Sequence, residues 1–185
     1  MRLSAVSYWA DFFLAPLLGF VLVWVAPAPA TWTGVGSWLG WVAGGLAAWT
    51  LFEYAVHRFI YHRLPYFRDI HEAHHAEPRG LIGAPPVLGL VLILVVFHVP
   101  LWPLGEVAAS AFAIGALIGY VAYMVLHHAA HHWKTQPGTW LHLARRHHAL
   151  HHHATEDCNF GITTSFWDRV FGTALRASRG AARSR

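Results

Sequence analysis

Histidine is the residue type in this chain with the clearest chemical potential. The 185 residues include sixteen histidines, and all except His98 lie in two windows, 57–75 and 127–153. Neutral imidazole is the commonest metal ligand among side chains, and it suits iron, zinc, copper and nickel rather than magnesium or calcium. The two windows therefore predict bound transition-metal ions.

The spacing of these histidines is helical. The segments 71–75 and 148–152 both read His-x-x-His-His, and residues i, i+3 and i+4 share one face of an α-helix. We expect each triplet of imidazoles to converge on one point.

Two further pairs end long apolar segments. His127 and His131 lie about one helical turn apart and should also converge. His57 and His62 differ by about 140° around an ideal helix. They are therefore expected to serve different ions, unless the helix unwinds between them.

The resulting ligand set has ten members, too many for one ion and suited to two ions with about five ligands each. A histidine-rich surface without an organised site, a metal transporter, and a storage or haem protein are the alternatives. The predicted ligands are His57, His62, His71, His74, His75, His127, His131, His148, His151 and His152.

These ligands must be positioned by elements that suit a membrane. The chain is 56% hydrophobic and 12% charged, and it has four apolar segments at about residues 8–26, 37–60, 87–104 and 107–126. Each has roughly the length that an α-helix needs to cross a bilayer. We expect a single all-α domain over residues 1–185, an integral membrane four-helix bundle.

The positive charges indicate the topology. All thirteen Lys and Arg residues are Arg2 or lie within 58–79 and 134–185. Four spans place these regions on one side, which the positive-inside rule makes cytosolic. The regions 57–86 and 127–173 should then form a cytosolic, helical, metal-binding cap, followed by a basic tail at 174–185. A bacterial inner membrane is the expected location, with both termini in the cytosol.

Small residues predict where the helices approach closely. Gly36, Gly40 and Gly44 repeat at four-residue spacing in the second span, as do Gly115 and Gly119 in the fourth. Small residues at this spacing let helices pack closely in lipid, and these are the two spans whose cytosolic ends carry histidines. The alternative is that these glycines only relieve crowding.

With these motifs in view, the chain resembles the fatty acid hydroxylase and sterol desaturase superfamily, and most of all its fatty acid 2-hydroxylase branch. The resemblance covers about residues 52–173. It rests on the histidine boxes, on the run His75-Ala-Glu-Pro-Arg-Gly-Leu-Ile-Gly-Ala-Pro-Pro, and on the closing run Asn159-Phe-Gly-Ile-Thr-Thr-Ser-Phe-Trp-Asp-Arg-Val-Phe-Gly-Thr173.

The resemblance implies an oxidoreductase that hydroxylates a lipid, in the first place a fatty acyl chain, with dioxygen and two electrons at two iron ions. Zinc can occupy the same ligands in purified protein. No catalytic residue beyond the metal ligands is expected, and no nucleic acid. A desaturase or a carotenoid or sterol oxidase would use the same site, and a histidine-rich metal-binding membrane protein is the non-enzyme alternative.

The electron donor is expected to be a separate protein, a ferredoxin or a small cytochrome with its reductase. Eukaryotic members of the branch carry a fused haem domain for this purpose, and this sequence does not include one. A basic cytosolic face would attract an acidic donor.

The histidine motif that ends the fourth span, the third histidine box, is doubled. His128 and His132 repeat the spacing of His127 and His131. We prefer the earlier pair, since Tyr123 then falls where the 2-hydroxylase branch has its tyrosine. The branch usually has an acidic residue after that tyrosine, where this chain has Met124.

Other side chains are candidates for orienting the imidazoles. Tyr123 is one, and Glu53 is the best carboxylate, since an acid within an apolar span is costly without a role. The full set of candidate carboxylates is Glu53, Asp69, Glu72, Glu156 and Asp157.

Overall fold

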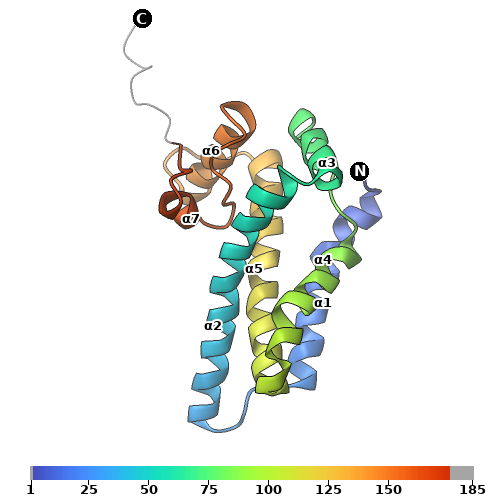
Figure 1. Cartoon of the computed structure of the whole chain (residues 1–185), viewed down its shortest axis with the longest axis vertical. Coiled ribbons are helices and arrows are strands. Elements are labelled where there is room, and N and C mark those ends of the chain that lie inside the picture. The colour runs from blue at the N-terminus through green and yellow to red at the C-terminus, as the bar shows by residue number, and fades with distance from the viewer. Residues whose placement is uncertain (1, 176–185) are drawn as a thin grey trace, which may run out of the picture.

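A computed structural model gives the structure of residues 2–175. Four helical segments long and apolar enough to cross a membrane run along the molecule (Figure 1). They are α1 (Ala5–Val25); α2 (Trp32–Ala55) with η1 (Val56–Tyr61); α4 (Pro86–Ile93) with η2 (Leu94–His98) and η3 (Val99–Leu104); and α5 (Glu106–His132). Over the described residues there is no β-strand, only an isolated bridge between Arg2 and Ile82. The predicted all-α membrane bundle is confirmed, with ends that differ by a few residues.

Local sequence explains where several helices begin. The side-chain oxygens of Ser4, Thr31 and Thr139 each accept a backbone N–H of the first turn that would otherwise lack a partner. Proline occupies the first turn of α3 (Pro65–Ala76) and of α4, where its missing N–H costs nothing.

The central helix of the bundle is α5, the most buried of the four spans, and α2 is its main neighbour. A Cβ atom on Gly115 would lie 2.0 Å from the Val42 carbonyl oxygen, and one on Gly45 would lie 1.9 Å from the Phe112 carbonyl oxygen. The backbones therefore meet closely at glycine, as expected for packing in lipid.

The glycine prediction for the second span was wrong in register. Gly36 and Gly40 have open space around them, and Gly44 meets only the edge of the Phe112 ring, at 3.4 Å. Gly45, one residue later, makes the close approach instead. The four-residue repeat identified the helix but not the face that α5 covers.

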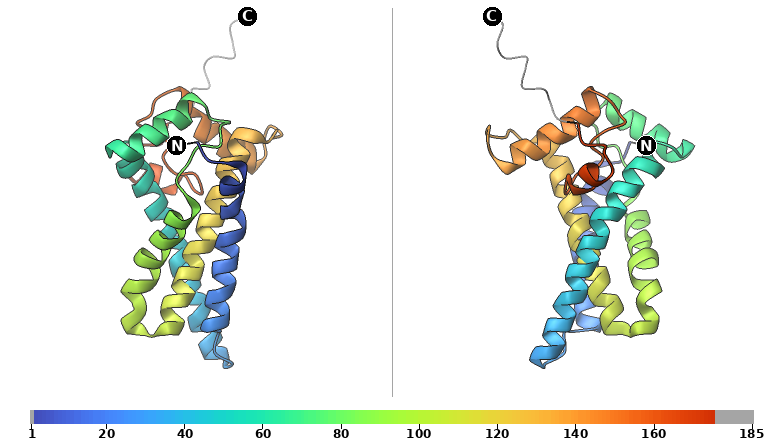
Figure 2. Two further views of the ribbon diagram at one scale, coloured as in Figure 1. Left: turned by 90° about the vertical axis from the view of Figure 1, so that its right-hand side faces the viewer. Right: turned by 60° about the vertical axis from the view of Figure 1, so that its left-hand side comes forward.

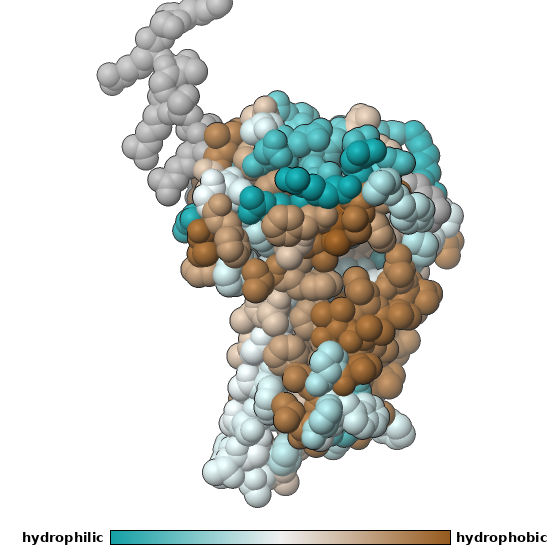
Figure 3. All heavy atoms as spheres, viewed as in Figure 1, coloured by the Kyte–Doolittle hydropathy of each residue, from teal (hydrophilic) through white to brown (hydrophobic). Residues whose placement is uncertain are grey.

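The polar part of the chain gathers at one end of the bundle. The helices α3, α6 (Trp140–His153) and α7 (Phe166–Val170) form a cap beyond the ends of α2 and α5, and the start of α1 lies at the same end (Figures 1 and 2). In Figure 3 the hydrophilic surface covers this cap, and the apolar surface lies below it. Both histidine windows therefore meet at one end, as the four-span topology requires. Of the expected basic tail, residues 176–185 lie outside the described part.

Candidate metal centre

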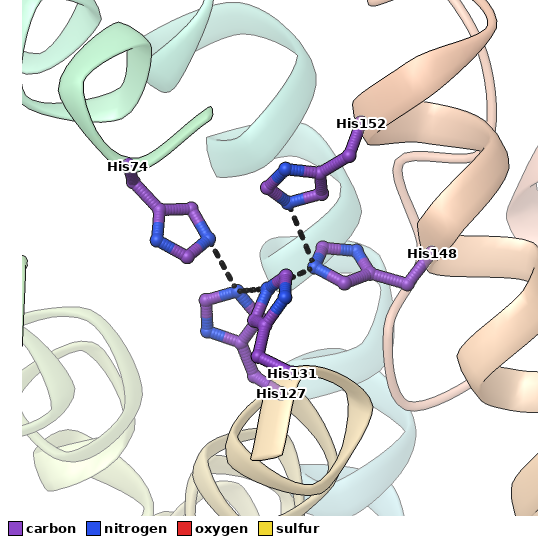
Figure 4. Close-up of side chains that lie close together, drawn as sticks. All are labelled: His74, His127, His131, His148 and His152. Atoms are coloured by element: carbon purple, nitrogen blue, oxygen red, sulfur yellow. Dashed lines mark hydrogen bonds between the residues drawn. The ribbon is translucent and has the colours of Figure 1, made fainter. Parts of the chain in front are cut away.

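Nine of the ten predicted ligands form two groups of converging imidazoles. In each group one ring nitrogen per residue lies within 4.8 Å of all the others, roughly the spread expected of nitrogens about 2.1 Å from a shared ion. The first histidine group is His74, His127, His131, His148 and His152 (Figure 4); the second histidine group is His57, His62, His71 and His151.

His75, the tenth predicted ligand, lies between the two groups. Its Nε2 atom is 3.0 Å from Nε2 of His71 and 3.1 Å from Nε2 of His151. Its ring also stacks on that of His152, with 4.1 Å between centroids. By its nitrogen it belongs with the second group, which then has five members, and by its ring it packs against the first.

The expectation that each triplet converges on one point was wrong. On α3, His71 and His75 face the second group, whereas His74 faces the first. On α6 the division is reversed, because His148 contributes to the first group and His151 to the second. Around the helix axis, residue i+4 lies only about 40° from residue i, whereas residue i+3 lies about 60° from residue i in the opposite direction. In both triplets the i+3 ring is therefore in one histidine group, and the rings at i and i+4 lie with the other.

The helix changes pitch where His57 and His62 arise. The segment η1 is π-helical, with hydrogen bonds from residue i to i+5. Because this wider turn brings residues five apart over one another, the two rings lie 5.3 Å apart and join the same group. The sequence allowed either two different ions for His57 and His62 or a change in the helix between them, and the structure has the changed helix.

Two backbone carbonyls orient imidazoles of the second group. Nδ1–H of His57 donates to the Phe160 carbonyl at 2.6 Å, and Nδ1–H of His151 donates to the Cys158 carbonyl at 2.7 Å. The proton on Nδ1 leaves the lone pair on Nε2, which points into the group. Sequence reasoning missed both acceptors, because every residue type carries a carbonyl and only the folded loop shows which ones face a ring.

The loop that carries these carbonyls, residues 158–163, is held by two buried carboxylates. Glu53 accepts the backbone N–H groups of Ile162 and Thr163, at 2.6 and 2.9 Å, and the Thr163 hydroxyl. Asp168 accepts the N–H groups of Phe160 and Gly161, at 2.8 and 2.9 Å. Both carboxylates therefore position the imidazoles through the loop.

The other orienting candidates are placed differently. The Tyr123 ring stacks on His127 with 5.6 Å between centroids. The Glu72 carboxylate pairs with Arg68 at 3.4 Å, as does Asp69 at 3.6 Å, and both carboxylates are exposed. The exposed Asp157 makes no hydrogen bond to a histidine among the described residues.

Glu156 is the candidate carboxylate that comes nearest to imidazole nitrogens. One of its oxygens lies 3.9 Å from Nδ1 of His62, and the other lies 3.9 Å from Nδ1 of His75. These separations are longer than hydrogen bonds, so Glu156 contributes charge to this edge of the second group rather than a direct contact.

The second half of the doubled box points away from both groups. Nδ1 of His128 lies 2.9 Å from the Tyr8 hydroxyl, and its ring stacks on His132 at 4.3 Å. His98 lies at the opposite end of the bundle, beside Glu106 and Ser110. It is a packed histidine and not part of either group.

The ligand candidates beyond the membrane spans are held neutral. Burial, reinforced by repulsion from neighbouring imidazoles, lowers the pKa of His62, His75 and His151 to about 4 and the pKa of His74 to about 3. Neutral imidazole is the form that binds metal. These rings therefore need no proton release to accept an ion at pH 7.

The imidazole nitrogens are better arranged to bind cations than to hydrogen-bond with one another. With its proton on Nδ1, His151 has one lone pair on Nε2, yet the Nε2 atoms of His62 and His75 both approach it, at 3.2 and 3.1 Å. One lone pair in the ring plane cannot accept from both. A cation at the centre of each group would satisfy all of these nitrogens.

Apolar cavities lead to both groups. A cavity of about 150 Å³ between α2, α4 and α5 is lined by His57 and Tyr61 and, deeper in the membrane, by Trp49, Ile93 and Tyr120. A smaller space of about 60 Å³ is lined by Tyr61, Tyr123 and histidines of both groups, His71, His74 and His127. An apolar molecule in the larger cavity would therefore lie next to the second group, and the smaller space lies next to both.

Comparison with known proteins agrees with this arrangement. The family model described as fatty acid hydroxylase matches residues 41–173, more than half of the chain. A dihydroceramide fatty acyl 2-hydroxylase of Arabidopsis thaliana is 34% identical over 98% of this chain and 79% of its own length. A ceramide very long chain fatty acid hydroxylase of Schizosaccharomyces pombe is 35% identical over 70% of this chain, but over only 40% of its own length.

A solved structure of full-length scs7p, in which only the hydroxylase domain is visible, has the same fold. It superposes with a TM-score of 0.78 at 26% identity, over 92% of this chain and 67% of that chain. The sequence match, the shared fold and the paired histidine groups lead to one conclusion: the chain belongs to the fatty acid hydroxylase family.

Proposed function

We propose that this protein hydroxylates a fatty acyl chain of a membrane lipid, with dioxygen and externally supplied electrons, at two metal ions. One observation carries the proposal. Two groups of buried or half-buried imidazoles lie beside adjoining apolar cavities, at the end of four helices that can span a membrane. Relatives whose names describe fatty acyl 2-hydroxylases support an acyl substrate, and carbon 2 as the position to test first.

We propose that the two histidine groups, with His75 completing the second, hold one ion each. The native ions would be iron, and zinc would compete for the same nitrogens in purified protein. When bound, iron would supply the reactivity towards dioxygen that no side chain has. The protein's own part is to hold ten neutral imidazoles in place and to keep water from an apolar chain.

The position of the cap suggests how substrate and electrons are supplied. Since the Lys and Arg residues within 2–175 lie at the cap end, we propose that the cap faces the cytosol of a bacterial inner membrane and that residues 1–185 act as one domain. A lipid would reach the site from the bilayer. A soluble, acidic ferredoxin or a small cytochrome would bring electrons to the basic cap.

Lipid analysis in a producing host tests the reaction. The chain is expressed with a competent electron donor, and total lipids are compared by mass spectrometry with those of the His74→Ala and His151→Ala variants, one from each group. Hydroxylation predicts a gain of one oxygen atom in acyl lipids that both variants lose. The His98→Ala variant, altered at the far end of the bundle, should keep the product.

The other outcomes distinguish the alternatives. A loss of two hydrogen atoms would identify a desaturase on the same site. An oxidised carotenoid or sterol with unchanged acyl chains would reassign the substrate. An unchanged lipid profile with the donor present would exclude acyl hydroxylation and would leave a metal-binding membrane protein.

A further inference from the structure

An apolar groove lies on the membrane-facing side of the molecule, between α2–η1 and α4. It has a volume of about 500 Å³ and is lined mainly by aliphatic and aromatic side chains, among them Phe52, Phe59, Leu64, Leu88 and Leu92. Both helices pack on α5 but make hardly any contact with each other, and α5 is visible between them in Figure 1. The groove therefore opens sideways, where the surrounding medium is lipid.

The groove continues inward to the cavity beside His57. The two spaces share six lining residues: Phe52, Val56, Tyr61, Ala84, Gly89 and Leu92. Tyr61 also lines the small space that touches both histidine groups, and its ring stacks on His71 with 5.5 Å between centroids. The groove, the inner cavity and the small space beside the histidines are therefore neighbours that share walls, in a line from the bilayer side to the candidate metal positions.

Gly89 on α4 controls the width of this route. A Cβ atom there would lie 2.7 Å from the Tyr120 hydroxyl oxygen and 3.2 Å from the Tyr120 Cζ atom. Both residues line the inner cavity. The Tyr120 ring is confined by Trp49 at 5.3 Å and by Tyr123 at 6.4 Å. A side chain at position 89 would therefore push the tyrosine into the space that the cavity occupies.

We propose that the groove and the inner cavity hold the acyl chain of a membrane lipid, which enters sideways between α2 and α4, and that Gly89 and Tyr120 set the width available to it. That the bound molecule is an acyl chain rests on the proposed function. The route itself rests on the apolar lining, the mouth between two spans, and the six residues that the groove shares with the cavity beside His57.

Photo-cross-linking tests the route without requiring turnover. The full-length, metal-loaded protein is reconstituted in phosphatidylcholine vesicles with fatty acids that carry a diazirine near the chain end, and the labelled residues are mapped by mass spectrometry. Label is expected on Trp49, Ile93 or Tyr120. Since one methylene in an apolar pocket changes discrimination by roughly tenfold or more, Gly89→Ala should lower this labelling about tenfold.

Matched variants test whether Gly89→Ala acts by narrowing the route or merely by replacing a glycine within a helix. Gly40→Ala also adds a methyl group to a glycine within a span, but into open space, and it should label like the wild type. Gly89→Ala combined with Tyr120→Phe removes the 2.7 Å clash and should recover most of the labelling. Metal content and thermal midpoint should be unchanged in Gly89→Ala. If that variant does not fold, Leu92→Trp fills the same route from a neighbouring position.

Each outcome decides one of the two claims. Label confined to the outer faces of α1 or α5, or labelling that neither Gly89→Ala nor Leu92→Trp reduces, would overturn the route. Label within the cavity without any oxygen gain in lipids would leave the route intact and remove the hydroxylase proposal. Oxygen gain in lipids with label outside the cavity would overturn the route and leave the hydroxylase proposal intact.

Discussion

At the scale of single residues, the proton on each imidazole decides which nitrogen is free for a metal. The carbonyls of Phe160 and Cys158 hold the protons of His57 and His151 on Nδ1 and direct Nε2 into the second group. By contrast, Nδ1 of His74 and Nδ1 of His148 are buried without a hydrogen-bond partner among residues 2–175. The first group is therefore oriented by packing and by the ion that we propose, and the second also by hydrogen bonds.

The doubled box offers a matched pair of tests at this scale. His127→Ala is expected to lower bound metal from about two ions per chain to about one, because it removes a nitrogen from the first group. His128→Ala removes a ring that contacts Tyr8 instead and should retain both ions. Metal analysis of the purified variants measures this. Metal loss in His128→Ala together with full occupancy in His127→Ala would reverse the ligand assignment.

Glu53 is the residue whose predicted role changed most in the structure. It orients the loop rather than an imidazole, so Glu53→Gln should destabilise the loop. The amide oxygen could keep both backbone N–H groups, but the NH2 group would replace the oxygen that accepts from the Thr163 hydroxyl. Losing that hydrogen bond should cost about 0.5–1.5 kcal/mol. The thermal midpoint in detergent should fall, whereas Glu72→Gln, on an exposed ion pair, should change it little. An unchanged midpoint in Glu53→Gln would refute this role.

At the scale of elements, two features bring the ligands together: the π-helical turn of η1 and the tethered loop 158–163. The turn places His57 and His62 in one group, and the loop supplies the carbonyls behind the rings. Neither element follows from residue spacing alone. A π-helical turn has the composition of an α-helix, and the loop acquires its shape from carboxylates on α2 and α7.

The loop should respond to acid through Asp168. Burial raises the pKa of this carboxyl, but hydrogen bonds from His147, Gly161, Thr173 and Phe160 outweigh it and lower the pKa below its ordinary value. Because the pKa of Asp168 is lower in the folded than in the unfolded protein, the ionised carboxylate stabilises the fold. This contribution is complete above about pH 4, the ordinary pKa of aspartate, and is lost as the pH falls through the lowered pKa.

The corresponding variant isolates this contribution. Asp168→Asn should be less stable than the wild type at pH 7, by about 1.5–3 kcal/mol for lost hydrogen bonds to a charged group. The difference in thermal midpoint between the two proteins should shrink as pH falls below about 4. Asp69→Asn, at an exposed position, is the control. A difference that stays constant across this pH range would show that the charge of Asp168 does not hold the loop.

At the scale of the whole molecule, the two histidine groups join four separate elements, α2–η1, α3, α5 and α6. Bound ions would therefore tie the cap to the bundle. Removing them with a strong chelator should lower the thermal midpoint, since an ion at a hundredfold excess over its Kd contributes about 2.7 kcal/mol. Re-addition of iron or zinc should restore it.

A double variant provides the control for chelation. His148→Ala with His151→Ala removes one nitrogen from each group, so chelator should shift its midpoint much less than that of the wild type. An equal shift in both proteins would mean that the stabilising ions bind elsewhere.

Much of the architecture could be predicted before the fold was known. Four spans and the meeting of the two histidine windows at one end follow from hydropathy and charge, because a membrane restricts the backbone to helices of fixed length. Even the change of helical pitch near His57 appeared as one of two alternatives.

The tertiary structure decided which imidazole belongs to which histidine group. It divided each His-x-x-His-His triplet between two groups, made Gly45 rather than Gly44 the close contact with α5, and placed Glu53 behind a loop instead of a ring. These outcomes depend on how the helices are rotated and on a loop more than a hundred residues away along the chain. Periodicity along a chain specifies a face of each helix, but only packing against the other helices specifies what that face meets.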